Sequence, residues 1–208
     1  LKEILKSNTQ DVLICLPRVF DSKWLNEDNP VERSFWKNHL LMARHKWYHL
    51  LSSKVKYGNA LCSRFYSIDF DYDKSKEIYT LWEQIWYKRD LVIIEGQDSK
   101  LGVGNNCFDG STSIKRIIAP SKNSFVRYNE ILNTALHQDP NALYLIALGP
   151  TATVLAYDLA ISGRQALDIG HIDLEYEWWT QRTTTKTTIP GKFCNCLLYT
   201  SPSPRDTR

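Results

Sequence analysis

The chain has 208 residues, and 26 Lys and Arg against 23 Asp and Glu give a net charge of +3. That balance excludes a nucleic-acid binder that works through bulk charge, and it excludes an acidic disordered chain. Hydrophobic residues make up 43% and charged residues 24%, as in an ordinary folded domain, and no apolar run approaches the roughly 20 residues of a membrane helix.

The first half of the chain alternates between strand and helix patterns. Residues 11–16 form an apolar run and predict a buried strand, residues 31–51 have helical spacing, and residues 59–66 predict a second strand. Residues 75–87 give the clearest amphipathic helix. Its apolar side chains recur at intervals of three and four residues: Ile78, Leu81, Trp82, Ile85 and Trp86.

The second half repeats this alternation more regularly. The predicted elements are strands over 91–95, 114–119, 143–148 and 165–169, and helices over 123–137 and 151–161. Strands that alternate with helices of this length imply right-handed crossovers and a mostly parallel sheet. The predicted fold class is therefore α/β, a single Rossmann-like domain whose sheet is flanked by helices.

The last residues are expected to be foreign to the fold. Residues 196–206 match the translation of a sequencing-library adapter, so residues 196–208 are predicted to be a non-native, disordered tail. We expect one domain over residues 1–195, truncated at its N-terminus because the chain starts at Leu1 rather than Met. The cysteines outside the tail lack a CxxC spacing, which favours free thiols and a cytoplasmic setting: Cys15, Cys62, Cys107 and Cys194.

Three loops that follow predicted strands have unusual compositions, and ligands collect at the carboxyl ends of parallel strands. The first loop runs from Glu95 to Asn106; three glycines allow a backbone to approach a ligand, and Lys100 can balance a phosphate. It is neither a P-loop nor a GxGxxG motif. The alternative is an ordinary surface loop.

The second loop lies between a predicted strand and a predicted helix. Gly149 allows a tight turn and Pro150 suits the first helical turn. Free N–H groups at the helix start, with the hydroxyls of Thr151 and Thr153, are suited to a phosphate. Plain capping of the helix by threonine is the alternative.

The third loop, residues 168–179, is acidic. In an extended chain His171, Asp173, Glu175 and Glu177 share one face, whereas in a helix His171 pairs with Glu175, and Asp173 with Glu177, four residues apart. Either arrangement concentrates oxygen ligands around one imidazole, which suits Mn²⁺ or Mg²⁺ better than a thiolate-bound metal. The alternative is a half-buried edge strand with a solvated acidic face.

Residues 148–158 and 166–178 strongly resemble bacterial glycosyltransferases of the GT-D fold family, long catalogued as a conserved domain of unknown function. Shorter similar stretches lie at residues 15–18, 35–37, 56–60, 63–64, 101–105 and 120–123, so the resemblance covers residues 8–195. It implies transfer of a sugar, expected to be a hexose such as glucose, from a UDP-sugar to an acceptor glycan in bacterial polysaccharide or glycoprotein synthesis.

The resemblance also implies a metal site and a set of donor contacts. The family's DxE motif would be Asp173-Leu174-Glu175, with His171 as a further ligand, and we expect Mn²⁺ rather than Mg²⁺. Glu177 or Asp168 is expected to act as the base for the acceptor hydroxyl. The expected donor-binding residues are Arg64, Glu95 (at a ribose or sugar hydroxyl), Gly96, Lys100, Asn105, Ser121, Asn123 (at the uracil), Gly149, Pro150, Thr151 and Thr153.

Two departures from the family pattern matter. An S-R-x-G-D-G-E-like segment that usually opens the family would lie upstream of Leu1, and Lys100 and Asn106 stand where Arg and Asp are expected. The main alternative is therefore an inactive nucleotide-sugar-binding module. A Rossmann-like enzyme that uses a dinucleotide or a methyl donor is disfavoured because the glycine fingerprint is missing.

Overall fold

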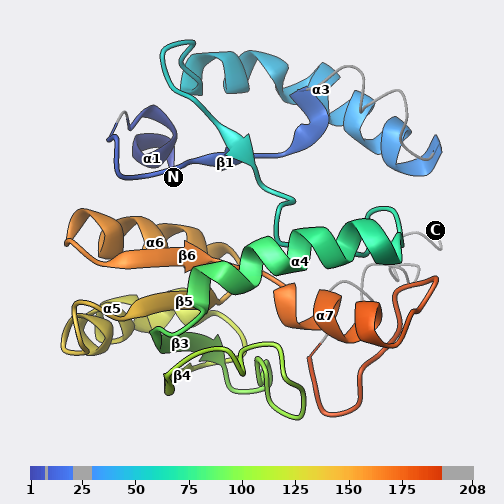
Figure 1. Ribbon diagram of the computed structural model, residues 1–208. Coiled ribbons are helices and arrows are strands. Elements are labelled where there is room, and N and C mark those ends of the chain that lie inside the picture. The colour runs from blue at the N-terminus through green and yellow to red at the C-terminus, as the bar shows by residue number, and fades with distance from the viewer. Residues whose placement is uncertain (8, 21–29, 194–208) are drawn as a thin grey trace. The chain divides into compact units, whose positions relative to one another are not determined.

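The computed structural model describes residues 1–7, 9–20 and 30–193, and the chain divides into two compact units, Leu1–Cys62 and Ser63–Arg208 (Figure 1). The predicted tail, residues 196–208, lies outside the described residues, as does Cys194. The prediction of a disordered tail and the predicted domain limits therefore stay predictions.

The first unit is mainly helical. It contains α1 (Lys2–Lys6), the 3₁₀ helix η1 (Arg18–Phe20), and α3 (Pro30–Leu50), which confirms the helix predicted over residues 31–51. Two short parallel strands complete it, β1 (Cys15–Leu16) and β2 (Gly58–Asn59).

The longer strands predicted over residues 11–16 and 59–66 are wrong. Only Cys15 and Leu16 pair, and the chain turns directly after Asn59. The Asn59 Oδ1 accepts a hydrogen bond from the Leu61 N–H at 2.9 Å, and this Asx turn bends the backbone out of the extended conformation. The apolar residues that follow therefore enter turns rather than a sheet.

The second unit contains a four-stranded parallel sheet in the order β4-β3-β5-β6. Its strands are β3 (Asp90–Gly96), β4 (Ser113–Ala119), β5 (Leu143–Ala147) and β6 (Gln165–Asp168), each boundary within one residue of the prediction. β3 and β5 are central, with Leu91 opposite both Ile114 and Leu143. Because β4 is added on one side of β3 and β5 on the other, the strand order reverses between β3 and β5. Open α/β sheets bind ligands at such a switch point.

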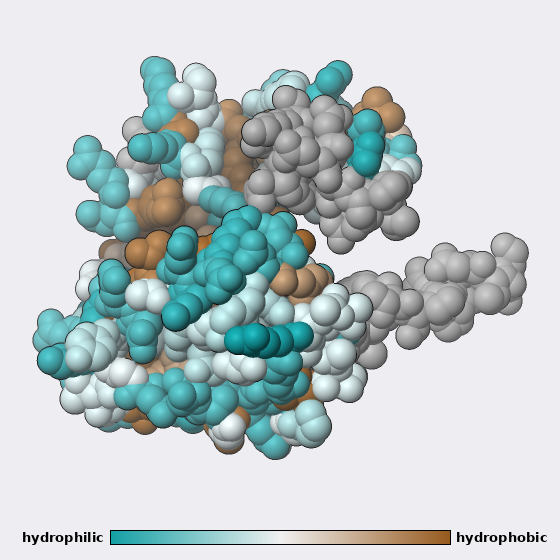
Figure 2. All heavy atoms as spheres, turned by 45° about the vertical axis from the view of Figure 1, so that its right-hand side comes forward, coloured by the Kyte–Doolittle hydropathy of each residue, from teal (hydrophilic) through white to brown (hydrophobic). Residues whose placement is uncertain are grey.

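Helices cover both faces of this sheet, which confirms the predicted fold class. One face packs against α4 (Tyr72–Trp86) and α7 (Ile172–Thr180), and the other against α5 (Tyr128–Leu136) and α6 (Pro150–Ile161). The central strands are apolar at nearly every position because both of their faces are buried. On the face that Figure 2 shows, the second unit presents mainly hydrophilic side chains, as expected when the apolar ones are gathered into the core.

Local chemistry sets the helix boundaries. α4 begins three residues before the predicted start because the Asp71 side chain accepts a hydrogen bond from the Lys74 N–H at 3.0 Å and caps the helix. The helix predicted over residues 123–137 divides into the 3₁₀ helix η2 (Ser124–Arg127) and α5, and Asn123 before it is left-handed with φ 54°. The acidic segment, left open between strand and helix, forms α7.

Candidate functional site

A cavity of about 610 Å³ lies at the carboxyl ends of the four strands of the second unit. The loops that follow β3, β4, β5 and β6 all contribute to its wall, together with Phe193 from the segment after α7. This volume lies within the usual range of small-molecule sites. The sequence-predicted residues that line the cavity are Gly96, Ser121, Asn123, Gly149, Pro150, Thr151, His171 and Asp173.

The start of α6 is open toward this cavity. Gly149 has φ 55° and ψ −140°, a conformation available essentially to glycine, and it turns the chain from β5 into the helix. No side chain among the described residues caps the helix start, so the alternative of plain threonine capping does not describe it. Pro150 and Thr151 belong to the cavity wall, and the positive end of the α6 dipole, which no described side chain caps, suits an anion.

His171 lies in the cavity wall in an electropositive environment. Burial, followed by the charges of Arg64 and Lys186, lowers the pKa of His171 to about 4. The imidazole is therefore neutral at neutral pH. Arg64 does not line the cavity, but a guanidinium and an ammonium close enough to shift this pKa give that side of the cavity a positive potential.

Asp168 ends β6 and lies outside the cavity lining, two residues before the lining residue Gly170. Its carboxylate accepts a hydrogen bond from the Thr153 hydroxyl at 2.9 Å and another from the Gly170 N–H at 3.2 Å. Neighbouring protein atoms raise the pKa of the carboxylate by partial desolvation, although the residue keeps an exposed surface and the two hydrogen bonds oppose the rise. A carboxylate with a raised pKa is better suited to accept a proton from a hydroxyl group.

Asp173 belongs to the cavity wall and is held by a dense set of hydrogen bonds. Its Oδ1 accepts from the Gly102 N–H and from the Asn105 side-chain amide, both at 2.8 Å. The Lys192 Nζ lies 2.9 Å from Oδ1 and 2.7 Å from Oδ2. The predicted donor ligand Asn105 therefore positions a carboxylate and lies outside the cavity lining.

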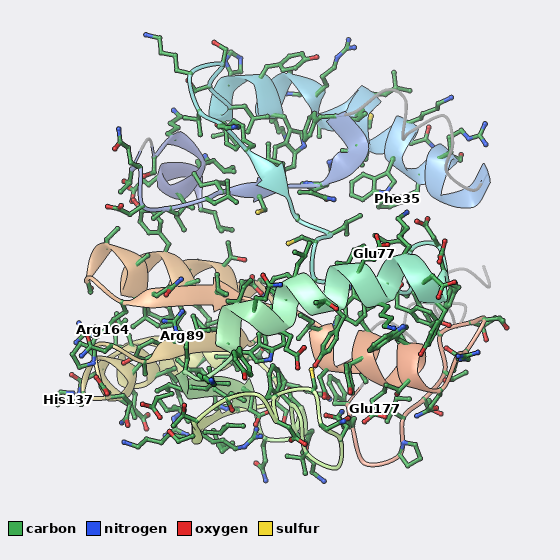
Figure 3. The ribbon with its side chains drawn as sticks, viewed as in Figure 1. Phe35, Glu77, Arg89, His137, Arg164 and Glu177 are labelled. Atoms are coloured by element: carbon green, nitrogen blue, oxygen red, sulfur yellow. The ribbon has the colours of Figure 1, made fainter. Side chains whose placement is uncertain are left out.

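Glu177 shares these partners one helical turn further along α7 (Figure 3). Its Oε1 lies 2.7 Å from the Asn105 amide nitrogen and 3.0 Å from the Lys192 Nζ. Burial alone would raise the pKa of Glu177, but the hydrogen bonds from Asn105 and Lys192 outweigh it and lower the pKa. Glu177 is thus a structural partner of Lys192, and its lowered pKa does not support the role of base.

Glu175 points away from the cavity into the protein interior. It is fully buried, and it accepts hydrogen bonds from the Tyr66 N–H at 3.0 Å and from the Ser67 N–H and hydroxyl, both at 2.6 Å. Residues two apart on a helix differ by roughly 200° in direction, so α7 separates Asp173 from Glu175. The extended alternative, which placed both on one face, is wrong.

Glu95 likewise has a structural role instead of the predicted contact with a ribose or sugar hydroxyl. It is 1% exposed, and its Oε2 accepts a hydrogen bond from the Leu101 N–H at 2.7 Å. Arg116 pairs with Oε1 and also donates to the Leu101 carbonyl at 2.7 Å. Glu95 and Arg116 together therefore clamp the glycine loop at Leu101. Lys100, beside this clamp, is left-handed with φ 51° and lies outside the cavity lining.

Sequence reasoning missed Arg116 and Lys192 completely. Arg116 occurs in the middle of a strand and Lys192 in the irregular segment after α7, and neither position belongs to a recognisable motif. Lys192 finds Asp173 and Glu177 only through the fold. The sequence gives no signal for the cavity residue Phe193 either, because it lies in the same irregular segment as Lys192.

Over residues 1–196 the sequence matches the family described as glycosyltransferase GT-D fold. The chain belongs to this GT-D family. The match extends over both compact units, and the resemblance carried by residues 148–158 and 166–178 is confirmed.

The curated relatives that the chain matches are considerably longer. The chain is 39% identical over 188 residues to the glycosyltransferase GlyD of Streptococcus pneumoniae serotype 4 (strain ATCC BAA-334 / TIGR4), a match that covers 90% of this chain and 23% of GlyD. It is 38% identical over 193 residues to the probable glycosyl transferase Gly of Streptococcus gordonii, covering 92% and 28% respectively. The chain therefore spans about a quarter of the length of these relatives.

Solved structures of GT-D domains share the fold. A structure described as the highly conserved domain of unknown function 1792 with a distinct glycosyltransferase fold superposes with a TM-score of 0.87 at 37% identity, covering 96% of this chain and 71% of that one. A new glycosyltransferase of the same domain type from Streptococcus sanguinis gives 0.84 at 38% identity, covering 93% and 72%.

The predicted three-ligand metal site does not fit this GT-D domain. Within the described ranges, no three His, Cys, Asp or Glu side chains come together in a way that could hold a metal ion. His171 and Asp173 line the cavity, but both oxygens of Glu175 are engaged by Tyr66 and Ser67 in the interior.

Proposed function

We propose that this chain transfers a hexose such as glucose from a UDP-sugar to an acceptor glycan in bacterial polysaccharide or glycoprotein synthesis. The observation that carries the proposal is the cavity, in which the open start of α6 and the electropositive surroundings of His171 meet at the strand ends. Family membership supports sugar transfer, and this arrangement supports a diphosphate-containing donor.

A UDP leaving group needs its negative charge neutralised as the glycosidic bond breaks. The first turn of α6 supplies the positive end of a helix dipole that no described side chain caps. Arg64 and Lys186 add positive potential from the side of His171. Donors and charges that are already in place when the charge develops are the usual source of such stabilisation.

The acceptor hydroxyl needs a base, and Asp168 is the better of the two predicted carboxylates. Its raised pKa favours proton uptake, whereas the pKa of Glu177 is lowered by its partners. Asp168 would take the hydroxyl proton while the acceptor oxygen forms the new bond to the sugar and the bond from the sugar to UDP breaks.

Titration calorimetry of UDP and uridine tests the proposal. UDP is expected to bind at least tenfold more tightly than uridine, and Lys186→Gln should reduce that ratio, while Lys76→Gln on the exposed face of α4 serves as a control of equal charge. Equal affinities for UDP and uridine would contradict the proposal. Tight UDP binding without any turnover of UDP-glucose would favour the inactive binding module.

Repeating the titration with Mn²⁺, Mg²⁺ and EDTA tests metal dependence, for which Mn²⁺ stays the predicted ion.

No helix within the described ranges combines the length and the apolar character needed to cross a membrane. The cytoplasmic location and the absence of a nucleic-acid partner also stay predictions.

A further inference from the structure

The two oxygens of the Asp173 carboxylate differ in how many hydrogen bonds they accept. A carboxylate offers about four lone-pair positions. Oδ1 accepts hydrogen bonds from Gly102, Asn105 and Lys192, whereas Oδ2, among the described residues, accepts only from Lys192. Asp173 belongs to the cavity wall, and Oδ2 is its oxygen with the fewer partners.

The surrounding charges favour a hydroxyl group over a metal at this oxygen. The Lys192 ammonium lies 2.7 Å from Asp173 Oδ2 and 3.0 Å from Glu177 Oε1, and its side chain is only 5% exposed. A divalent cation bound to the same oxygen would be repelled by this ammonium at short range, in surroundings that screen charge poorly. A neutral hydroxyl donates to a carboxylate without that repulsion.

We propose that Asp173 Oδ2 accepts a hydrogen bond from a hydroxyl group of the transferred sugar and thereby contributes to the choice of donor sugar. This inference rests on the proposed function, which brings a UDP-sugar into the cavity. Asn105 and Lys192 act as positioning residues because they hold the carboxylate in one orientation. A buried acceptor built for one hydroxyl rejects a sugar that lacks it, since the carboxylate is then left without its partner.

The test compares Asp173→Asn with Glu177→Gln. Both variants remove one negative charge next to Lys192, but only Asp173 lines the cavity. In EDTA, Asp173→Asn should weaken UDP-glucose binding about tenfold or more, as for loss of a hydrogen bond to a charged group, and change UDP binding by less than about twofold. Glu177→Gln should leave the ratio of the two affinities unchanged.

Deoxy analogues of UDP-glucose, each lacking one sugar hydroxyl, keep the test independent of how well the variants fold. One analogue should bind the wild-type protein about tenfold more weakly than UDP-glucose and should lose little further affinity in Asp173→Asn, as a double-mutant cycle requires.

Three outcomes would overturn the inference while leaving the proposed function intact. They are equal losses for UDP and UDP-glucose, a loss that appears only when Mn²⁺ is present, and a wild-type protein that binds UDP yet accepts every deoxy analogue equally well. Failure of the wild-type protein to bind UDP would instead overturn the proposed function, and this inference with it.

Discussion

The loops after β3 and β5 border the same cavity but are held in place differently. The loop after β3 is fixed by carboxylates, with Glu95 holding Leu101 and Asp173 holding Gly102. The turn after β5 is fixed by the backbone conformation of Gly149, and no described side chain caps the helix that follows. Where side chains hold a loop, their hydrogen-bonding capacity is used inside the protein. Where the backbone holds it, the start of the following helix needs no side-chain cap and keeps the positive end of its dipole uncovered.

Removing Glu95, which together with Arg116 clamps the glycine loop at Leu101, should have the largest effect on the free energy of unfolding. Glu95→Ala removes the carboxylate partner of Arg116 and the acceptor of the buried Leu101 N–H, and the loss of these two charge-assisted hydrogen bonds costs about 3–5 kcal/mol. Urea unfolding should show this loss, with Glu95→Gln intermediate. Unchanged stability together with lost UDP affinity would return Glu95 to the predicted contact with a ribose or sugar hydroxyl.

Acidification should lower the free energy of unfolding through protonation of His171, which lies on the β6 side of the cavity. Burial, with Arg64 and Lys186, lowers its pKa from 6.5 to about 4, so between these values the unfolded chain binds a proton that the folded protein does not. The free energy of unfolding should therefore fall as the pH drops from about 6.5 to about 4, by about 3 kcal/mol in total.

His171→Gln isolates this contribution, because the other titrating groups are common to both proteins. The difference in unfolding free energy between wild type and variant should change across this pH range and stay constant above pH 7. A difference that does not depend on pH would contradict the neutral, buried imidazole.

Strain at the backbone-held turn should have a smaller effect on stability. Gly149→Ala places a Cβ in open space but at φ 55°, so the cost is conformational and about 1–3 kcal/mol. Gly163→Ala, at φ 78° after the other end of α6, also meets no neighbouring atom and is the matched control. Both should lower the melting temperature, but only Gly149→Ala should weaken UDP more than uridine. Equal losses of UDP affinity in the two variants would contradict a phosphate site at this turn.

The smallest effect on stability is expected for a substitution at Thr153. Its hydroxyl donates to Asp168, and loss of this bond in Thr153→Val should cost about 0.5–1.5 kcal/mol. Because the bond favours the charged carboxylate, its loss raises the pKa of Asp168 further. The acidic limb of the pH profile for UDP-glucose turnover should therefore move to higher pH. Thr80→Val, which removes a hydroxyl on α4, should not move the limb.

The sheet could be predicted because its strands have a strong local pattern. β3 and β5 are nearly continuous apolar runs bounded by turn residues, and both faces of the sheet need such residues. The runs at residues 11–16 and 59–66 looked similar but pair over only two residues each. An apolar run is not enough for burial, since in residues 11–16 only Ile14 is buried and Leu13 is 68% exposed, and a strand also requires a neighbouring strand of matching length.

The site could be predicted where a local conformation creates it and not where distant groups meet. Gly149 and Pro150 predict their turn because both residue types favour the backbone conformations that it needs. Glu175 and Glu95 were read as ligands because nothing nearby reveals that their partners are Ser67 and Leu101. Lys192 gives no signal at all, since its carboxylates become its neighbours only after folding.

The strand order also constrains how the chain reaches its folded state. β3 pairs with β4, which follows it directly, and with β5, which is joined to it only through β4 and α5. During synthesis one edge of β3 stays unpaired until β5 has been made. Val92 and Ile94 of β3 stay uncovered over the same period, because they lie on the face that packs against α5 and α6. A nascent chain that pauses before Leu143 therefore exposes an unpaired apolar strand edge, the kind of surface to which chaperones bind and through which chains aggregate.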